Sequence, residues 1–329
     1  MKASSILEGI RKLRVLVVGD ICLDRWCHYD PATAEPSRET GIPRIGVVDT
    51  EVTPGAAGTV ANNLIALGAA QVAVLGVVGQ DGFGFELQKA LEARGITADL
   101  AVTSTVVPTF TYTKLINRDT GVEDQPRVDF IYTKPMPPEV EHAVIERLNQ
   151  CWNDFDVVLV SDQAETELGG IVTPAVRNRI SELAEGTPEK IVWVDSRVRG
   201  EHFRNVLVKC NDGEAEAACT RAFGHVDLAS LRRQVGTKPL IVTEGRKGAV
   251  VLTEDGEARV PTRAVEKPVD ICGAGDSFSA GGALALAITR SPLDAAWFGN
   301  LVSSITIMKK GTGTASPEEL LAAERDWKQ

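Results

Sequence analysis

The sequence lacks the patterns of several common site types, and these absences narrow the function first. Its six cysteines include no C-x-x-C pair and its four histidines lie far apart, so neither a zinc site nor a disulfide framework is expected. No apolar run reaches the roughly 18 residues that cross a bilayer, and the N-terminal run VLVVG is too short for a signal peptide. We therefore expect a cytoplasmic protein with no membrane partner.

Basic clusters and two common phosphate motifs are absent as well. The 329 residues carry 35 Lys and Arg against 45 Asp and Glu, a net charge of −10, and the basic residues are scattered. Because a phosphate backbone needs a basic stripe, nucleic acid is not expected as a partner. The chain has no G-x-x-x-x-G-K-[ST], and GDICLD stands after the first apolar run instead of G-x-G-x-x-G. A P-loop ATPase and a dinucleotide oxidoreductase are therefore disfavoured.

What the sequence does contain is an alternation of strand and helix patterns. Apolar runs typical of buried parallel strands, most of them ending in Gly or a polar residue, lie at 13–20, 70–79, 155–162, 190–196, 205–212 and 239–245. Helical patterns lie between them at 58–68, 85–95 and 173–186. This succession predicts an α/β protein with a doubly wound, mostly parallel central sheet, in which ligands bind at the carboxyl ends of the strands.

Two segments depart from this rhythm. Residues 41–52 and 108–132 alternate polar and apolar side chains, with a turn near Asp119, Thr120 and Gly121. Such alternation without an intervening helix predicts a small antiparallel flap outside the main sheet. No repeat, low-complexity tract or linker divides the chain, so residues 1–329 are expected to form a single domain with the flap inserted as a lid.

The segment DICGAGDSFSAGG, residues 270–282, stands directly before an apolar helical run. Gly273, Ala274 and Gly275 would leave the backbone N–H groups at the start of that helix open to an anion, which the helix dipole attracts. Asp276 would lie in the first turn, kept ionised by the same field, beside the group that receives a phosphate. The structural alternative is a tight glycine turn in which Asp276 only caps the helix. This segment alone leaves the two interpretations about equal.

Several motifs together resemble those of the PfkB carbohydrate kinases, also called the ribokinase family. DICGAGDSFSAG is similar to the family signature in which D-T-x-G-A-G-D opens a helix and its last Asp is the catalytic base. Further matching segments stand in the family's order along nearly the whole chain: VVGDICLD, PGAAGTVANNLIALGA, GVVGQDGFG, NDGE, VTEGRKG and KKGTGT. The resemblance implies a ribokinase-like fold and transfer of the γ-phosphoryl of ATP to a hydroxyl of a sugar or sugar phosphate.

A narrower resemblance is to the kinase domain that acts on D-glycero-D-manno-heptose 7-phosphate, through VVGDICLDRW, RVDF, VVLVSD and NVLVKCNDGEAEAA. The bifunctional enzymes of that subgroup continue into a nucleotidyltransferase domain with an H-x-G-H motif, which this sequence lacks, so a kinase-only protein is expected. At the sugar-binding turn, Gly55, Ala56, Ala57, Gly58 and Thr59 depart from the family's G-G-A-x-N. A methyl replaces a hydrogen there and a hydroxyl replaces an amide, so the sugar could differ as well.

The resemblance assigns roles to individual residues. Asp276 would be the base, and Gly273, Ala274 and Gly275 would form the anion hole. The sugar would bind at Asp20, Asp24, Gly55, Thr59 and Asn63, and ATP at Asn211, Glu214, Thr243, Gly245, Gly248 and Asn300. Turns and helix caps are the structural alternatives for most of these positions, and Asn211 with Glu214 has the spacing of a plain capping pair.

The cations and further partners follow from the same resemblance. Glu214 would organise Mg²⁺ through water, and Asp270 matches a position that holds a monovalent cation such as K⁺. On the flap, Arg127 and Asp129 alternate with apolar neighbours, and Arg127, Arg38 or Arg44 would bind an acceptor that already carries a phosphate. A homodimer formed through the lid is implied too. The alternatives are a kinase for an unphosphorylated sugar or a nucleoside, and a non-catalytic sugar- or nucleotide-binding regulator on the same fold.

Overall fold

Eight strands form the large sheet of the computed structural model, which describes residues 2–164, 169–236, 238–263 and 265–327. Their order is β14 (Gly256–Val260), β13 (Ala249–Thr253), β12 (Leu240–Thr243), β11 (Leu207–Asn211), β10 (Ile191–Ser196), β9 (Val157–Asp162), β1 (Arg14–Gly19) and β4 (Gln71–Leu75). Every pair from β12 to β4 is parallel, and β13 and β14 add antiparallel pairs at one edge. The predicted mostly parallel central sheet is confirmed.

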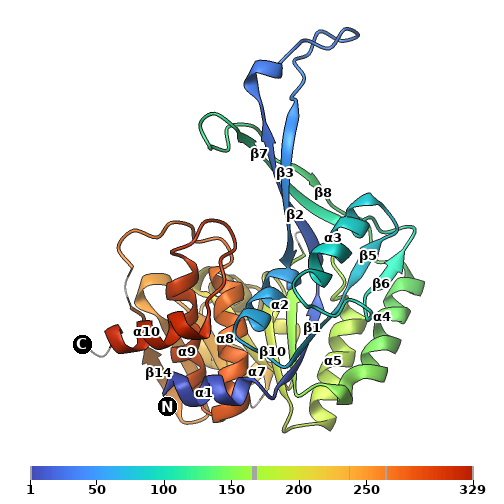
Figure 1. Ribbon diagram of the computed structural model, residues 1–329. Coiled ribbons are helices and arrows are strands. Elements are labelled where there is room, and N and C mark those ends of the chain that lie inside the picture. The colour runs from blue at the N-terminus through green and yellow to red at the C-terminus, as the bar shows by residue number, and fades with distance from the viewer. Residues whose placement is uncertain (1, 165–168, 237, 264, 328–329) are drawn as a thin grey trace.

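Alternate residues of the buried strands face different layers of helices. Val15 and Val17 of β1 pack in a core shared with α1 (Ala3–Ile10), α2 (Ala57–Ala66), α3 (Gly82–Glu92), α8 (Ala274–Thr289), α9 (Pro292–Thr306) and α10 (Pro317–Trp327). Leu16 and Val18 pack on the other face, against α4 (Pro138–Cys151), α5 (Pro174–Gly186), α6 (Asp212–Phe223) and α7 (Leu228–Val235). Helices therefore cover both faces of the sheet, as in a doubly wound fold (Figure 1).

The apolar run at 70–79 forms two strands rather than the single one expected. β4 ends at Leu75, and β5 (Val77–Gly79) leaves the large sheet to pair with β6 (Val102–Ser104). The break falls at Gly76, where a Cβ atom would lie 2.6 Å from Ile21 and 2.7 Å from the carbonyl oxygen of Gly19. The chain turns at Gly76 because only a residue without a side chain fits there.

A second sheet projects from the body as a lid (Figure 1). Its strands, in order, are β3 (Val47–Ala56), β2 (Ile21–Tyr29), β7 (Phe110–Asn117) and β8 (Val128–Phe130). The outer pairs are antiparallel, and β2 pairs with β7 in parallel. The segment Ile21–Tyr29, which was not expected to be a strand, continues directly from β1 into the lid, and residues 41–46 lie outside its strands.

Short 3₁₀ turns lie at η1 (Pro31–Thr33), η2 (Trp152–Asp154), η3 (Gly200–His202) and η4 (Gly245–Lys247).

The helix predicted to follow the glycine-rich turn is α8, which begins at Ala274. Its residues from Ser277 to Leu286 are all buried, and it packs mainly against α9 and α2. In the described part of the chain, no helix combines the length and apolar character needed to cross a bilayer. The apolar character of α8 therefore reflects its central place in the core.

Candidate active site

Two cavities meet at the start of α8. The lid cavity, about 250 Å³, lies under the inner face of the lid and is lined by Asp24, Trp26, Thr59, Tyr112, Lys114 and Arg127, among others. The sheet cavity, about 510 Å³, lies at the carboxyl ends of β10, β11 and β12 and is lined by Asp195, Lys209, Asn211, Glu214, Thr243 and Gly245, among others. Gln163, Arg197, Gly273 and Asp276 line both. Asp276 therefore stands where a group in one cavity would meet a group in the other.

In the part of the chain that the structure describes, the turn before α8 leaves the backbone N–H groups of Gly273, Gly275 and Asp276 open, whereas that of Ala274 donates to the carbonyl oxygen of Ile271 at 3.2 Å. Gly273 is the N-cap residue with φ 76°, a left-handed conformation that glycine adopts without strain, and no side chain caps the helix. Among the described residues, none donates a hydrogen bond to the Asp276 carboxylate, which lies in the first turn. The geometry therefore favours the anion-binding interpretation of this segment over simple capping.

Burial changes the acid strength of Asp276. Its low solvation, and then the nearby Asp195 carboxylate, raise the pKa of Asp276 to about 7, although Lys209 and Arg197 act in the opposite direction. Desolvation therefore outweighs the helix field that was expected to keep this group fully ionised. A carboxylate with a pKa near 7 is a stronger proton acceptor at neutral pH than an ordinary Asp.

Asp24 faces the lid cavity from β2, and its surroundings are built around it. The Cys22 thiol lies 3.7 Å from Asp24 Oδ1, and burial raises the pKa of Asp24 to about 6. A Cβ atom on Gly55 would lie 2.5 Å from the same oxygen, so Gly55 is required for Asp24 to sit there. Ala56 also lines the cavity and has φ 51°, a strained value for a residue with a side chain.

Four predicted sugar-binding residues lie outside the lining of the lid cavity: Asp20, Gly55, Asn63 and Asp129. The carboxylate of Asp20 accepts hydrogen bonds from the backbone N–H groups of Gln163, at 3.0 Å, and Ile171, at 2.8 Å. Asn63 is fully buried in α2 and donates to the carbonyl oxygen of Thr59 at 3.0 Å. Thr59 itself does line the cavity. In this structure Asp20 and Asn63 support the walls of the site, and Thr59 faces its interior.

The polar side chains of the lid divide into two groups. Arg127 lines the lid cavity, forms a 2.6 Å ion pair with Asp129 and lies over the Tyr112 ring. Lys114, which also lines the cavity, is 3.7 Å from Glu123. Arg38 and Arg44, in contrast, are exposed in the segment before β3 and do not belong to the cavity lining. Of the three arginines considered for an acceptor phosphate, only Arg127 is therefore suitably placed.

The sheet cavity contains most of the residues predicted to bind the nucleotide. Asn211 and Glu214 form a reciprocal capping box at the start of α6, with both N–H···O distances at 2.8 Å. The structural alternative for this pair is therefore present, and both residues still line the cavity. Thr243 and Gly245 line it from the end of β12.

Gly248 and Asn300 lie outside the lining of this cavity. A Cβ atom on Gly248 would lie 2.1 Å from the carbonyl oxygen of Val260, and Asn300 donates to that oxygen at 3.2 Å and to the oxygen of Pro261 at 3.3 Å. Both residues therefore contact the end of β14, and their contact with the nucleotide stays a prediction.

Asp270 connects two loops beside the turn. Its carboxylate accepts from the backbone N–H of Cys272 at 2.9 Å and from that of Gly311 at 3.1 Å. It therefore ties the segment before α8 to the KKGTGT segment.

Several residues that line the cavities were not predicted from the sequence, and four of them are polar residues near the carboxyl ends of the parallel strands. Gln163 follows β9, Asp195 and Arg197 lie at the end of β10, and Lys209 lies on β11. Asp195 and Lys209 form a buried ion pair of 2.8 Å. A signal for them existed, because polar residues at the carboxyl ends of buried parallel strands face the binding edge of such a sheet.

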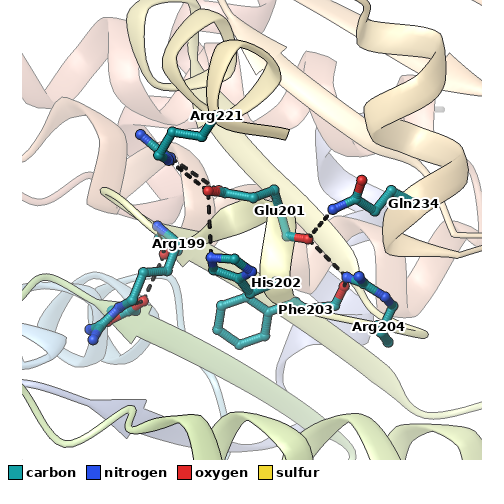
Figure 2. Close-up of polar contacts among 9 residues, drawn as sticks. Arg199, Glu201, His202, Phe203, Arg204, Arg221 and Gln234 are labelled. Carbon is teal, nitrogen blue, oxygen red and sulfur yellow. Dashed lines mark hydrogen bonds and ion pairs between the residues drawn. The ribbon is translucent and has the colours of Figure 1, made fainter. Parts of the chain in front are cut away.

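The buried carboxylate of Glu201 holds one end of α6 in place. Glu201 of η3 accepts two hydrogen bonds from Arg221, near the end of α6, at 2.6 and 3.0 Å (Figure 2). Its backbone oxygen accepts from Gln234 of α7 at 2.9 Å. Since α6 carries Asn211 and Glu214 at its other end, this cluster sets the position of their helix.

Comparison with known proteins gives relatives over most of the chain. Bifunctional protein HldE of Pelobacter propionicus is 32% identical over 332 residues, covering 97% of this chain and 64% of the relative. Its counterpart from Chromohalobacter salexigens is 32% identical over 328 residues, covering 96% and 64%. The chain thus spans less than two thirds of the length of these relatives.

Solved structures share the fold at lower identity. Ribokinase from Thermotoga maritima has a TM-score of 0.70 at 20% identity, covering 95% of this chain and 99% of its own. Phosphofructokinase-2 from Escherichia coli, in complex with potassium, has a TM-score of 0.71 at 16% identity, covering 96% and 100%. A putative ribokinase II from E. coli, in complex with ATP and Mg²⁺, has a TM-score of 0.67 at 17% identity, covering 95% and 99%. These likenesses confirm the ribokinase-like fold.

The family follows from one further match. The model of the pfkB family carbohydrate kinases matches residues 13–167 and 202–319, which include Asp24, the Asn211–Glu214 pair and the turn before Asp276. The chain therefore belongs to the pfkB family of carbohydrate kinases, which are phosphotransferases acting on sugar hydroxyls.

Proposed function

We propose that this protein transfers the γ-phosphoryl group of ATP to a hydroxyl of a sugar phosphate of the heptose 7-phosphate type. We infer the class of acceptor from the charged side chains that line the lid cavity. Lys114, Arg127 and Arg197 line it together with Asp24 and Asp276, although the chain as a whole has a net charge of −10. Carboxylates suit sugar hydroxyls, and guanidinium groups match phosphate oxygens in pairs. The motif resemblance to heptose 7-phosphate kinase domains supports the same acceptor.

The arrangement of the two cavities suggests how the chain performs the transfer. The acceptor would bind in the lid cavity with its hydroxyls on Asp24, and the triphosphate would bind in the sheet cavity, so that Asp276 lies between them. A bond forms between the acceptor oxygen and the γ-phosphorus while the bond from that phosphorus to the ADP oxygen breaks. Asp276 takes the hydroxyl proton, and the open N–H groups of the anion turn, residues 273–276, hold the charge that develops on the phosphoryl oxygens.

The described residues fit Mg²⁺ only as an indirectly held ion. They include no group of three or more His, Cys, Asp or Glu side chains that could hold a metal by themselves, and the Glu214 carboxylate already accepts a backbone N–H. Glu214 and Asn211 would therefore hold Mg²⁺ through water while phosphate oxygens complete its shell. When bound, the ion neutralises phosphate charge. The E. coli neighbour in complex with ATP and Mg²⁺ supports this assignment.

We extend the proposal to a monovalent cation and to assembly. Asp270 would help to hold K⁺ beside the anion turn, in line with the potassium complex of phosphofructokinase-2. Two copies would associate through their lids. A cytoplasmic location is consistent with the six cysteines, all of which are free. Full turnover in EDTA would contradict the Mg²⁺ role, and equal rates with K⁺ and a large organic cation would contradict the K⁺ role.

The experiment that tests the proposed function is an ADP-release assay over sugars, sugar phosphates and nucleosides. We expect turnover to be highest with a phosphorylated sugar such as heptose 7-phosphate. Arg127→Ala should raise KM for that substrate far more than KM for ATP, because it removes a phosphate ligand from the lid cavity. Arg38→Ala, on the same lid but outside the cavity, is the matched control and should leave both KM values unchanged.

The same assay can overturn the assignment. A preference for unphosphorylated sugars or nucleosides, with an unchanged KM in Arg127→Ala, would contradict the sugar phosphate. No ADP release with any acceptor, despite ATP binding, would instead favour a non-catalytic regulator.

A further inference from the structure

A buried ion pair lies directly beneath the anion turn. Asp195 on β10 and Lys209 on β11 are partners in the parallel register of these strands, and Lys209 Nζ lies 2.8 Å from Asp195 Oδ2. Their residues are only 4% and 3% exposed. The Ser279 hydroxyl, one turn into α8 from Asp276, donates to the same Asp195 oxygen at 2.7 Å. Lys209 from β11 and Ser279 from α8 thus both donate to the Asp195 carboxylate on β10.

The ammonium of Lys209 has more donors than the protein uses. It carries three N–H groups, and the carboxylate of Asp195 is the hydrogen-bond acceptor that the described residues provide. Burying a charge is costly unless its hydrogen bonds are satisfied, so a lysine with only a structural role would have further acceptors. Lys209 lines the sheet cavity together with Gly275 and Asp276, which leaves its remaining donors available to a ligand there.

Lys209 remains charged in this position. Burial alone would lower the pKa of Lys209, but Asp195 opposes this effect and, with Glu214 and Asp276 adding to it, raises the pKa above its ordinary value. A fixed positive charge therefore lies at the floor of the sheet cavity, and it faces three carboxylates that come from β10, α6 and α8.

The position of Gly275 depends on this ammonium. A Cβ atom at residue 275 would lie 3.1 Å from Lys209 Nζ, closer than a comfortable contact. Gly275 therefore lacks a side chain for a second reason besides the approach of an anion to its N–H group. It also lets the ammonium approach the point at which the turn would hold a phosphoryl group.

We propose that Lys209 contacts the transferring phosphoryl group from beneath the anion turn, and that Asp195 and Ser279 are positioning residues that hold its ammonium there. This inference rests on the proposed kinase function. Lys209 stays protonated throughout the transfer, because the hydroxyl proton goes to Asp276. Its role is to place a preorganised positive charge where negative charge develops on the phosphoryl oxygens.

Two variants distinguish this role from a purely structural ion pair. Lys209→Met should lower kcat on the order of 10² to 10³-fold, as loss of one preorganised donor does, and should lower Tm because Asp195 is left buried and unpaired. The double variant Asp195→Asn with Lys209→Met removes both charges and keeps an acceptor for Ser279. We expect it to recover Tm but not kcat. If it recovers both, the pair is structural and the proposal is overturned.

A binding measurement tests the contact independently of turnover. Lys209→Met should weaken the affinity for ATP more than the affinity for ADP, because only ATP carries the phosphoryl group in question. Lys190→Met, which removes a half-buried lysine just before β10 at the opposite end of that strand, is the control and should leave the ratio of the two dissociation constants unchanged. An unchanged ratio in Lys209→Met would overturn the proposal.

The two measurements also separate this inference from the proposed function. If the wild-type protein releases no ADP with any sugar, the kinase assignment fails, but the ATP to ADP affinity ratio still reports whether Lys209 reaches the terminal phosphate.

Discussion

At the scale of single residues, the isolation of Asp276 decides its chemistry. Among the described residues it has no hydrogen-bond donor, and burial with the nearby Asp195 charge raises its pKa to about 7. An ordinary Asp, with a pKa of about 3.9, would be a weak proton acceptor from an alcohol. Burial raises the free energy of the ionised Asp276 carboxylate, and for the same reason it makes this carboxylate a suitable base at neutral pH.

The first prediction replaces this carboxylate with an amide. Asp276→Asn keeps the size of the side chain but cannot accept the proton, so kcat should fall on the order of 10² to 10⁴-fold. ATP affinity should persist or rise slightly, because a negative charge beside the phosphates is gone. The measurement is kcat together with the ATP dissociation constant and thermal melting. A folded variant that keeps more than about a tenth of wild-type kcat would contradict the assignment.

The second prediction concerns pH and follows from the same pKa. Because the base must be unprotonated, kcat/KM of the wild-type protein should be half-maximal near pH 7 and fall about tenfold per pH unit below it. Stability should change in the opposite sense. The pKa of Asp276 is about 7 in the folded state and about 3.9 in the unfolded chain. Above pH 7 the ionised, buried carboxylate therefore destabilises the fold. This destabilisation decreases as the pH falls from 7 toward 3.9, because the carboxyl group is then protonated in the folded state.

Thermal melting of Asp276→Asn checks the sign of this linkage. The variant should melt at a higher temperature than the wild type at pH 8, and the difference should shrink as pH falls through 7. Asp20, whose pKa burial raises to about 6, is present in both proteins and cancels in the comparison. A wild type that melts higher than the variant at pH 8 would be incompatible with the raised pKa.

Single residues also show where sequence reasoning reaches its limit. Asp276 and its glycines were predicted because a motif marks them and a helix N-terminus explains them. Gly248 and Asn300 match family positions equally well, yet one is constrained by the carbonyl of Val260 and the other hydrogen-bonds to it. A residue type that suits a ligand also suits a backbone group, and only the three-dimensional neighbours distinguish the two.

At the scale of elements, α6 combines a structural and a functional role. Asn211 and Glu214 satisfy each other's backbone N–H groups, and the Glu201–Arg221 contact holds the opposite end of the helix (Figure 2). A capping box needs only an acceptor at its third position, which Gln provides as well as Glu. The charge of Glu214 is therefore not needed for capping, and it remains available for a cation.

The third prediction uses this difference. Glu214→Gln should leave Tm nearly unchanged, since the capping box survives. It should raise the Mg²⁺ concentration for half-maximal activity by roughly 10- to 100-fold, as the loss of an outer-shell partner of a metal does. Glu216→Gln, an exposed position on the same helix, is the control and should affect neither quantity. An unchanged Mg²⁺ requirement in Glu214→Gln would mean that Glu214 is only a cap.

The six parallel strands of the large sheet could be predicted from the sequence because they are buried on both faces, which gives continuous apolar runs. The antiparallel strands β13 and β14 were not predicted, and β14 is largely exposed. The strand Ile21–Tyr29 could not be predicted, because Asp24, Arg25 and His28 interrupt its apolar pattern and it follows Asp20 without a turn sequence. Asp24 and Arg25 line the lid cavity, and Arg25 lies 3.6 Å from Glu86 of α3. His28 instead lies 3.7 Å from Glu51 of β3. The pattern departs from that of an ordinary strand because the element belongs to the site.

At the scale of the whole molecule, the lid has too small a core to be stable alone. Its own buried cluster consists of Cys27, Tyr29 and Leu115, and the first residues of β3 are exposed. Exposed apolar side chains gather on its two edge strands and the flanking loops, at Ile42, Ile45, Val47, Val48, Val128, Phe130 and Ile131. Edge strands with such side chains are favoured sites of association. The lid of a second copy of this chain would cover these exposed apolar side chains.

The fourth prediction tests this association. Wild-type protein should sediment as a dimer, and Val48→Asp, which places a charge at a side chain that is 50% exposed on β3, should sediment as a monomer. Because the lid carries Asp24, Lys114 and Arg127, the monomer should also show a raised KM for the acceptor with little change in KM for ATP. Val226→Asp, at a 55% exposed side chain of the body, controls for the added charge. A Val48→Asp protein that still sediments as a dimer, or a wild type that is monomeric at micromolar concentration, would contradict assembly through the lid.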